Sequence, residues 1–191
     1  MDLHRINVKI YLAEGSVPAP DTTFKVFNSW IQQADDELLI DVADYSHVPS
    51  GPVTLLVGHQ ANYSIDNHGD RLGLLYSHKA ASEGDLSQRL TGAIGAALKA
   101  CQRLENEPEF NNEVQFSGQE LLLSSNDRLA APNTEATFAA LQPDLDGVLS
   151  RLYGGTGYSL KRDEDPAKLL TLHIAADGPQ TVGDLLGNLD L

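Results

Sequence analysis

Residues 86–105 read LSQRLTGAIGAALKACQRLE, and the rest of the chain is arranged around this stretch. At about 100° per residue, its apolar side chains fall in one arc roughly 140° wide, which is enough to cover a core. The arc consists of Leu90, Ala93, Ile94, Ala97, Leu98, Cys101 and Leu104. Asp85 and Gln88 have the spacing of a capping box, and Pro108 follows the end of the pattern. We therefore predict a long central helix over 86–105.

Strand patterns precede this helix. Apolar and polar residues alternate over 6–12, which is typical of a strand with one buried face. Residues 53–57, VTLLV, form a nearly continuous apolar run, which indicates a strand covered on both faces. Residues 63–66 and 72–76 flank a connection that contains Asn and Gly, so they predict a hairpin. A further strand is predicted over 38–43.

Two other helices are predicted, a short one near the N-terminus and one in the second half of the chain. Near the N-terminus, Asp21 or Thr22 caps a helix whose aromatic side chains are spaced to enter the core, namely Phe24, Phe27 and Trp30. In the second half, Asn133 or Thr134 caps a helix that keeps one apolar face through Pro143. A proline inside such a pattern predicts a kink or a brief break.

The remaining elements set the fold class. After the central helix the patterns predict strands over 114–116 and 120–123, bent near Gly118, a strand pair over 158–161 and 169–174, and an amphipathic tail over 182–189. Hairpin-linked strands favour an antiparallel or mixed β-sheet with helices packed on it, which is the α+β class. At this length we expect a single domain over 1–191, with a strand-rich part (1–80), the central helix (85–106) and a strand and helix half (107–191).

The charge of the chain excludes some partners. Its 27 acidic and 13 basic residues give a net charge of −14. Such a chain repels phosphate backbones and anionic lipids, so we expect no nucleic acid and no membrane surface as a partner. The N-terminus passes directly into a strand pattern without a signal peptide, and the one cysteine, Cys101, has no partner for an intramolecular disulfide. The expected location is the cytoplasm.

The densest group of metal-ligand residue types surrounds the predicted hairpin. His59, Asp66 and His68 are the candidate ligands for a divalent metal, because Asp66 and His68 share a strand face and His59 precedes the strand. Their spacing matches none of the strong metal signatures. Asp, Asn, His and Gly are also the residues of a tight turn, which is the competing interpretation. No other cofactor is indicated.

Other motifs are explained by local structure. Ser64, Asp66 and His68 would stand about 6.6 Å apart along a strand, too far for a catalytic triad. The run Gly154–Gly157 follows a helix and precedes a strand, which is the reverse of a phosphate-binding loop. Residues 126–128, Asn-Asp-Arg, form a polar loop with an arginine suited to a carboxylate or phosphate. Local pairing of Asp127 and Arg128 is the simpler interpretation of that loop.

The central helix has small residues opposite its apolar arc. Gly92, Gly95 and Ala96 lie there, although each glycine costs a helix about 1 kcal/mol relative to alanine. Close approach of another backbone would explain them. We therefore predict an interface at these residues, with a neighbouring helix or with a second copy of the chain.

No stretch carries a catalytic signature. We therefore expect a non-catalytic protein that acts by binding, through self-association or through a protein partner with a basic surface. The alternative is a metal-dependent hydrolase that uses the His59, Asp66 and His68 cluster. An acidic mimic of nucleic acid ranks last, because the carboxylates are spread along the whole sequence.

Overall fold

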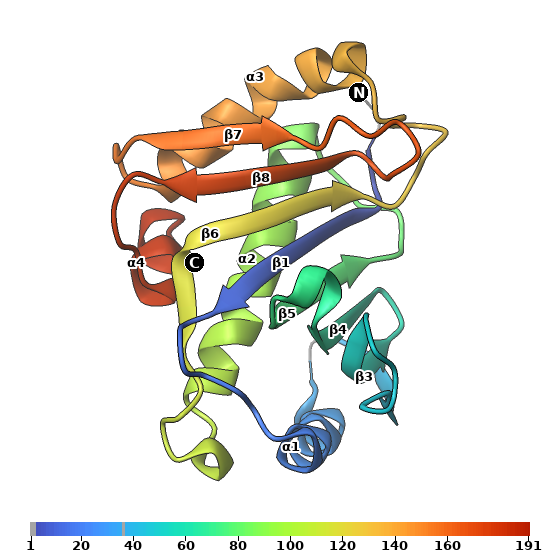
Figure 1. Ribbon diagram of the computed structural model, residues 1–191, viewed down its shortest axis with the longest axis vertical. Coiled ribbons are helices and arrows are strands. Elements are labelled where there is room, and N and C mark those ends of the chain that lie inside the picture. Colours follow the sequence, from blue (N-terminus) through green and yellow to red (C-terminus); the bar gives the residue numbers. More distant parts are fainter. Residues whose placement is uncertain (1–2, 36) are drawn as a thin grey trace.

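The computed structural model describes residues 3–35 and 37–191. All strands in this part of the chain join one antiparallel sheet, in the order β2-β3-β4-β5-β1-β6-β8-β7 (Figure 1). The fold is therefore α+β, as the sequence predicts, and of the two sheet types left open there, antiparallel or mixed, the sheet is antiparallel. The strands are β1 (Ile6–Leu12), β2 (Leu39–Asp44), β3 (Pro52–Gly58), β4 (Ala61–Asp66), β5 (Gly73–His78), β6 (Phe116–Ser125), β7 (Tyr158–Arg162) and β8 (Thr171–Ala176).

The helices connect these strands and pack against them. They are α1 (Pro20–Gln33), α2 (Leu86–Glu105), α3 (Glu135–Leu152) and α4 (Val182–Asn188), with short 3-10 turns η1 (His68–Asp70) and η2 (Pro108–Phe110). Helix α1 contacts β2 and β3, α2 contacts β1 and β5, and α4 contacts β6, while α3 packs on α2 and α4. None of the helices in the described ranges has both the length and the apolar character needed to cross a bilayer.

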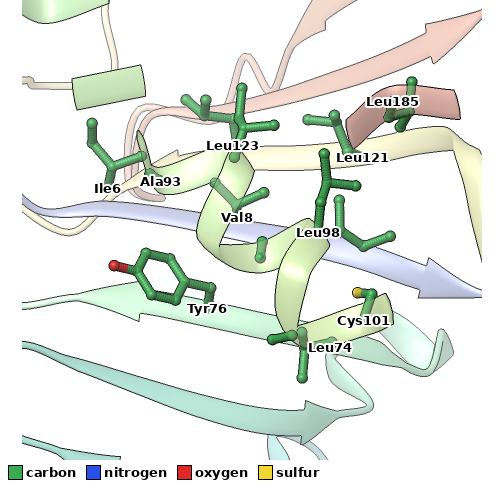
Figure 2. Packing of buried hydrophobic residues seen from close by; sticks show 14 of the residues in the cluster. Ile6, Val8, Leu74, Tyr76, Ala93, Leu98, Cys101, Leu121, Leu123 and Leu185 are labelled. Carbon is green, nitrogen blue, oxygen red and sulfur yellow. The ribbon is translucent and has the colours of Figure 1, made fainter. Parts of the chain in front are cut away.

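The central helix α2 has the predicted bounds and the predicted cap. The Asp85 carboxylate accepts a hydrogen bond from the backbone N–H of Gln88 at 2.9 Å, and the Gln88 side chain accepts one from the backbone N–H of Asp85 at 2.9 Å. Figure 2 shows its apolar arc against the sheet, with Ala93, Leu98 and Cys101 among the labelled side chains. The helix therefore covers the middle strands, as its apolar arc predicts.

The strand register places one buried row of side chains across the sheet, beneath the helices. From β2 to β8 the paired residues are Val42, Leu56, Tyr63, Tyr76, Val8, Leu123 and Leu172, and all are buried. Successive residues of a strand point to opposite faces. The adjacent row therefore lies on the other face, which none of the described α-helices covers. From β3 to β8 it consists of Leu55, Ser64, Leu75, Lys9, Leu122 and His173. We call this face the open face.

Three local predictions are wrong. The apolar run in β3 is covered on one face only, because Val53, Leu55 and Val57 lie on the open face and are half-buried. Helix α1 begins at Pro20 without a side-chain cap, because proline at the first helical position already fixes the helical φ. Phe24 is 37% exposed, whereas Phe27 and Trp30 enter the core.

In the second half, proline and glycine predict two bends. Helix α3 continues through Pro143 as one element. Strand β6 is one strand that bends near Gly118 as predicted, where its pairing with β1 shifts register between Ile10 and Leu12 (Figure 1). The N–H of Gly118 donates to the backbone oxygen of Gln180 at 2.9 Å. A Cβ at Gly118 would lie 2.7 Å from that oxygen, so this glycine permits close approach of the segment that leads into α4.

The small-residue patch on α2 has a partner within the chain. The Leu191 side chain fills the position that a Cβ of Gly95 would occupy, and Ala96 is half-buried. Gly92 is exposed, with open space around it. The neighbour at Gly95 is therefore the side chain of Leu191, and not the backbone of a neighbouring helix that the small residues predict. A second copy of the chain at this face stays a prediction.

Gly92→Ala should raise the free energy of unfolding by about 1 kcal/mol, because alanine costs less helix entropy and meets no neighbour. Gly118→Ala should lower it, because its Cβ meets two backbone oxygens. Urea unfolding measures both, and light scattering measures the mass. A destabilised Gly92→Ala protein with a smaller mass than wild type would show that Gly92 lies in an interface between copies.

Candidate functional site

A hollow of about 690 Å³ lies on the open face. Its floor comes from the middle strands and includes Asn7, Lys9 and Tyr11 of β1. One wall is formed by the end of β4 and the η1 segment, residues 66–71. The opposite wall is formed by Arg128 and by residues of the β7–β8 connection, 163–169. Segments far apart in the sequence therefore enclose one space.

A buried ion pair joins the floor to the first wall. The Lys9 ammonium donates to Asp66 Oδ1 at 2.7 Å, and both side chains are only 4% exposed. Lys9 also donates to the backbone oxygen of His68 at 3.1 Å, and the backbone N–H of His68 donates to Asp66 Oδ1 at 3.0 Å. These bonds hold η1 over the end of the sheet.

Gly73 makes room for this pair. It lies between β4 and β1 in the register, opposite Asp66 on one side and Tyr11 on the other. A Cβ at Gly73 would lie 3.1 Å from Lys9 Cε and 2.5 Å from the Ile10 backbone oxygen. The absence of a side chain here lets Lys9 cross β5 and reach Asp66.

Burial and pairing act on Lys9 in opposite directions. Burial lowers the pKa of the Lys9 ammonium, because removal from water penalises the charged form, and the Asp66 carboxylate opposes that shift. Breaking one partner of such a pair leaves an uncompensated buried charge, which costs about 3–5 kcal/mol. The pair is therefore a structural requirement of this face of the sheet.

Tyr11 of the floor and Arg71 of the first wall meet at the edge of the hollow. The Arg71 guanidinium lies 3.8 Å from the centre of the Tyr11 ring and forms an ion pair with Glu120 at 2.7 Å. Burial raises the pKa of the Tyr11 hydroxyl, and the positive charge of Arg71 opposes that rise. The ring is thus held flat beneath a cation at the edge of the hollow.

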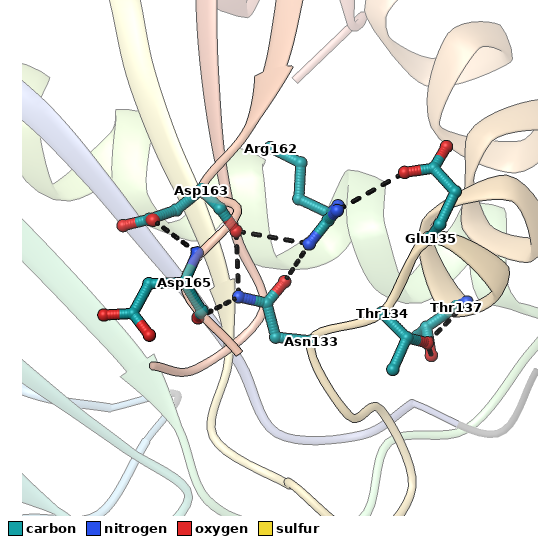
Figure 3. A network of polar contacts seen from close by, with 7 residues as sticks. All are labelled: Asn133, Thr134, Glu135, Thr137, Arg162, Asp163 and Asp165. Atoms are coloured by element: carbon teal, nitrogen blue, oxygen red, sulfur yellow. Dashed lines mark hydrogen bonds and ion pairs between the residues drawn. The ribbon is translucent and has the colours of Figure 1, made fainter. Parts of the chain in front are cut away.

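Asn133 fixes the opposite wall, as Figure 3 shows. Its side-chain amide donates to the backbone oxygens of Asp163 and Asp165, each at 2.8 Å, and accepts from Arg162 at 2.9 Å. Arg162 in turn pairs with Glu135 at 3.3 Å. Asn133 precedes α3, so this network ties the β7–β8 connection to the loop between β6 and α3.

The charged ends of this wall are Lys168, Asp163 and Arg128. Lys168 and Asp163 form an ion pair at 2.9 Å, which lowers the pKa of the Asp163 carboxyl and raises the pKa of Lys168. Asp127 accepts from the backbone N–H groups of Leu129 and Ala130, so it satisfies its own loop. Arg128 is exposed and lines the hollow, without an ion pair to any described residue.

The floor contains an unpartnered polar atom. Asn7 is 9% exposed, and its Oδ1 has no hydrogen-bond partner in the described part of the chain. In the register it lies between Ser77 on β5 and Ser124 on β6. A buried acceptor without a donor costs about 1–3 kcal/mol, and the fold carries this cost at a residue that lines the hollow.

The three metal candidates do not come together. His59 precedes β4 and Asp66 ends it, so roughly 17 Å of strand separates the two regions. Asp66 is engaged by Lys9, and His68 contributes its backbone to that contact. Across residues 3–35 and 37–191, no group of three His, Cys, Asp or Glu side chains is placed to hold a metal ion.

The comparisons with known proteins add nothing to this geometry. No protein-family model, curated protein or solved structure matches the chain. The candidate site therefore rests on the residues themselves. Sequence reasoning singled out Asp66, His68 and Arg128 but missed Asn7 and Lys9, which occupy polar positions in an alternating strand.

A second, smaller hollow of about 270 Å³ lies between the N-terminal half of α2 and the end of β5. His4, His78, Glu83 and Arg89 contribute ionisable groups to its lining. His78 Nδ1 and the Tyr76 hydroxyl are hydrogen-bonded at 2.9 Å, while His78 Nε2 has no partner among the described residues. Burial, helped by the charge of His4, lowers the pKa of His78.

The pKa of His78 predicts a pH dependence of stability. Below its ordinary value of 6.5 the unfolded chain binds the proton more readily than the folded chain, so the free energy of unfolding should fall as the pH drops from 7 to 5.5. His78→Gln should reduce this slope. Urea unfolding across that pH range measures it, and an equal slope in the variant would assign the titration to another group.

Lys9→Met should lower the free energy of unfolding by about 3–5 kcal/mol, because it leaves the Asp66 carboxylate buried without a cation. Adding Asp66→Asn should recover part of that loss, because the amide oxygen still accepts from His68. Lys161→Met, on exposed β7, is the matched control and should change stability by less than about 0.5 kcal/mol. Equal losses in the single and double variants would contradict the ion pair's role.

Proposed function

We propose that this protein is a non-catalytic binding protein that takes a small ligand into the hollow on its open face. The observation that carries the proposal is the unpartnered Oδ1 of Asn7, buried in the floor of a space of about 690 Å³. Ligand sites of small molecules commonly have volumes of about 300–1,000 Å³ and a few placed polar groups among apolar ones. Leu75 and Leu122 supply apolar lining here.

The construction of the hollow supports binding. The ion pair of Lys9 and Asp66 holds one wall, and the network around Asn133 holds the other. Polar groups that are fixed before a ligand arrives cost less ordering free energy on association. The hollow is therefore prepared for a ligand in the absence of one.

Other functions have less support. A metal-dependent hydrolase would need ligands that converge, and His59 and Asp66 lie at opposite ends of β4. A protein partner or a second copy at Gly92 remains a prediction, whereas Gly95 is already contacted by Leu191. The net charge of −14 argues against nucleic acid and anionic membrane surfaces. A cytoplasmic location is part of this proposal, since it rests on the sequence alone.

Filling the hollow tests the proposal. Ser124→Trp places an indole on the floor beside Asn7, and Ala175→Trp places the same group on the open face outside the lining. Ligand-observed NMR with a library of polar metabolites should find binders that wild type and Ala175→Trp share and Ser124→Trp has lost. Melting curves confirm that both variants fold.

Two outcomes would contradict the proposal. One is a folded Ser124→Trp protein that keeps every binder of wild type. The other is a wild-type protein that binds no member of the library.

A further inference from the structure

The charge of the hollow differs from that of the chain. Four basic side chains line it, Lys9, Arg71, Arg128 and Lys168, with two carboxylates, Asp66 and Asp163. The lining therefore carries an excess of two positive charges, whereas the whole chain carries −14. A cleft lined by one sign of charge concentrates ions of the opposite sign.

Three of these cations already have a carboxylate partner. Lys9 pairs with Asp66, Arg71 with Glu120 outside the lining, and Lys168 with Asp163. Arg128 has no such partner among the described residues. A guanidinium presents a planar fork of N–H groups that matches a carboxylate or a phosphate.

Arg128 and Asn7 belong to the same end of the hollow. The backbone N–H of Asn126 donates to the backbone oxygen of Arg5 at 2.9 Å, which joins the loop that carries Arg128 to the start of β1. Asn7 follows two residues later and pairs with Ser124. An acceptor in the floor and a cation at the rim are therefore offered to one ligand.

We infer that the hollow binds a small organic anion, whose carboxylate or phosphate contacts Arg128 and whose hydroxyl or N–H group donates to Asn7 Oδ1. This inference rests on the proposed function and names its ligand class. The Lys9 ammonium has one N–H beyond its bonds to Asp66 and His68, and it lines the same space. Leu75, Leu122 and Leu169 accommodate the carbon skeleton.

Four related probes distinguish the contribution of the anionic group from that of the hydroxyl-bearing carbon skeleton. Glycerol 3-phosphate and glycerate each combine an anion with hydroxyls, inorganic phosphate has no carbon skeleton, and glycerol has no charge. In a backbone amide NMR titration, the two organic anions should shift the resonances of residues around the hollow. They should do so at a ligand concentration at least tenfold lower than glycerol requires. Whichever of glycerate and glycerol 3-phosphate binds more tightly identifies the anionic group as carboxylate or phosphate.

Variants then test each contact. Arg128→Gln should weaken binding of glycerol 3-phosphate at least tenfold, and Lys99→Gln, an exposed lysine on α2, removes the same charge as a control. Asn7→Leu should weaken glycerol 3-phosphate more than inorganic phosphate. Asn62→Leu is its control, because Asn62 Oδ1 is also buried without a partner in the described residues but lies outside the hollow.

The outcomes are distinguishable from those of the filling experiment. Binding of uncharged compounds that Ser124→Trp abolishes, with no response to the anions, would overturn this inference and leave the proposed function standing. Equal binding of glycerol 3-phosphate by Arg128→Gln and wild type would also overturn it. No binding of any compound by wild type would overturn both.

Discussion

The described α-helices pack on one face of the sheet only. The opposite face is therefore covered, where it is covered at all, by connecting segments. The row from Val42 to Leu172 is sealed beneath the helices, so the opposite row is left to water or to whatever loops lie over it. At the middle strands the loops take that role. The η1 segment and the β7–β8 connection rise on either side, and polar side chains between them are nearly as buried as core residues. A partly enclosed polar space results where the strand pattern alone would place an exposed surface.

The energetics of this space support the proposed binding function more than a role in folding stability. Desolvation offsets much of the attraction between two charges whose side chains are only 4% exposed, so a buried ion pair is a weak source of folding free energy. An unpartnered amide oxygen at Asn7 adds a further cost. Apolar residues at these positions would suit the sheet at least as well. Polar groups held in place at such cost are those expected where a ligand completes the bonding.

Sequence patterns predicted the helix-facing half of the molecule well. Helix α2, its capping box and the α+β class follow from spacing within single segments, which local chemistry determines. The site does not follow in this way. Lys9 and Asp66 are 57 residues apart, and no local pattern shows that β1 lies in the middle of the sheet beside β5 and β6. The alternation of β1 correctly assigned Asn7 and Lys9 to the polar face, but it gave no sign that loops would bury them. The polar loop around Arg128 identified this arginine as a candidate for binding an anion. Its neighbour Asp127 accepts hydrogen bonds from the backbone of the same loop.

The two walls stand on different strands, with β5, β1 and β6 between them. Neighbouring strands are about 4.8 Å apart, so the backbones of β4 and β8, which are four strand spacings apart, are separated by roughly 19 Å. The gap between the walls is therefore set in part by the spacing and coiling of the strands on which the wall segments stand. A sheet resists such deformation far more than a loop does, because every rung must shift together. Part of any discrimination by ligand size in this protein would accordingly come from the fixed spacing of the hydrogen-bonded strands.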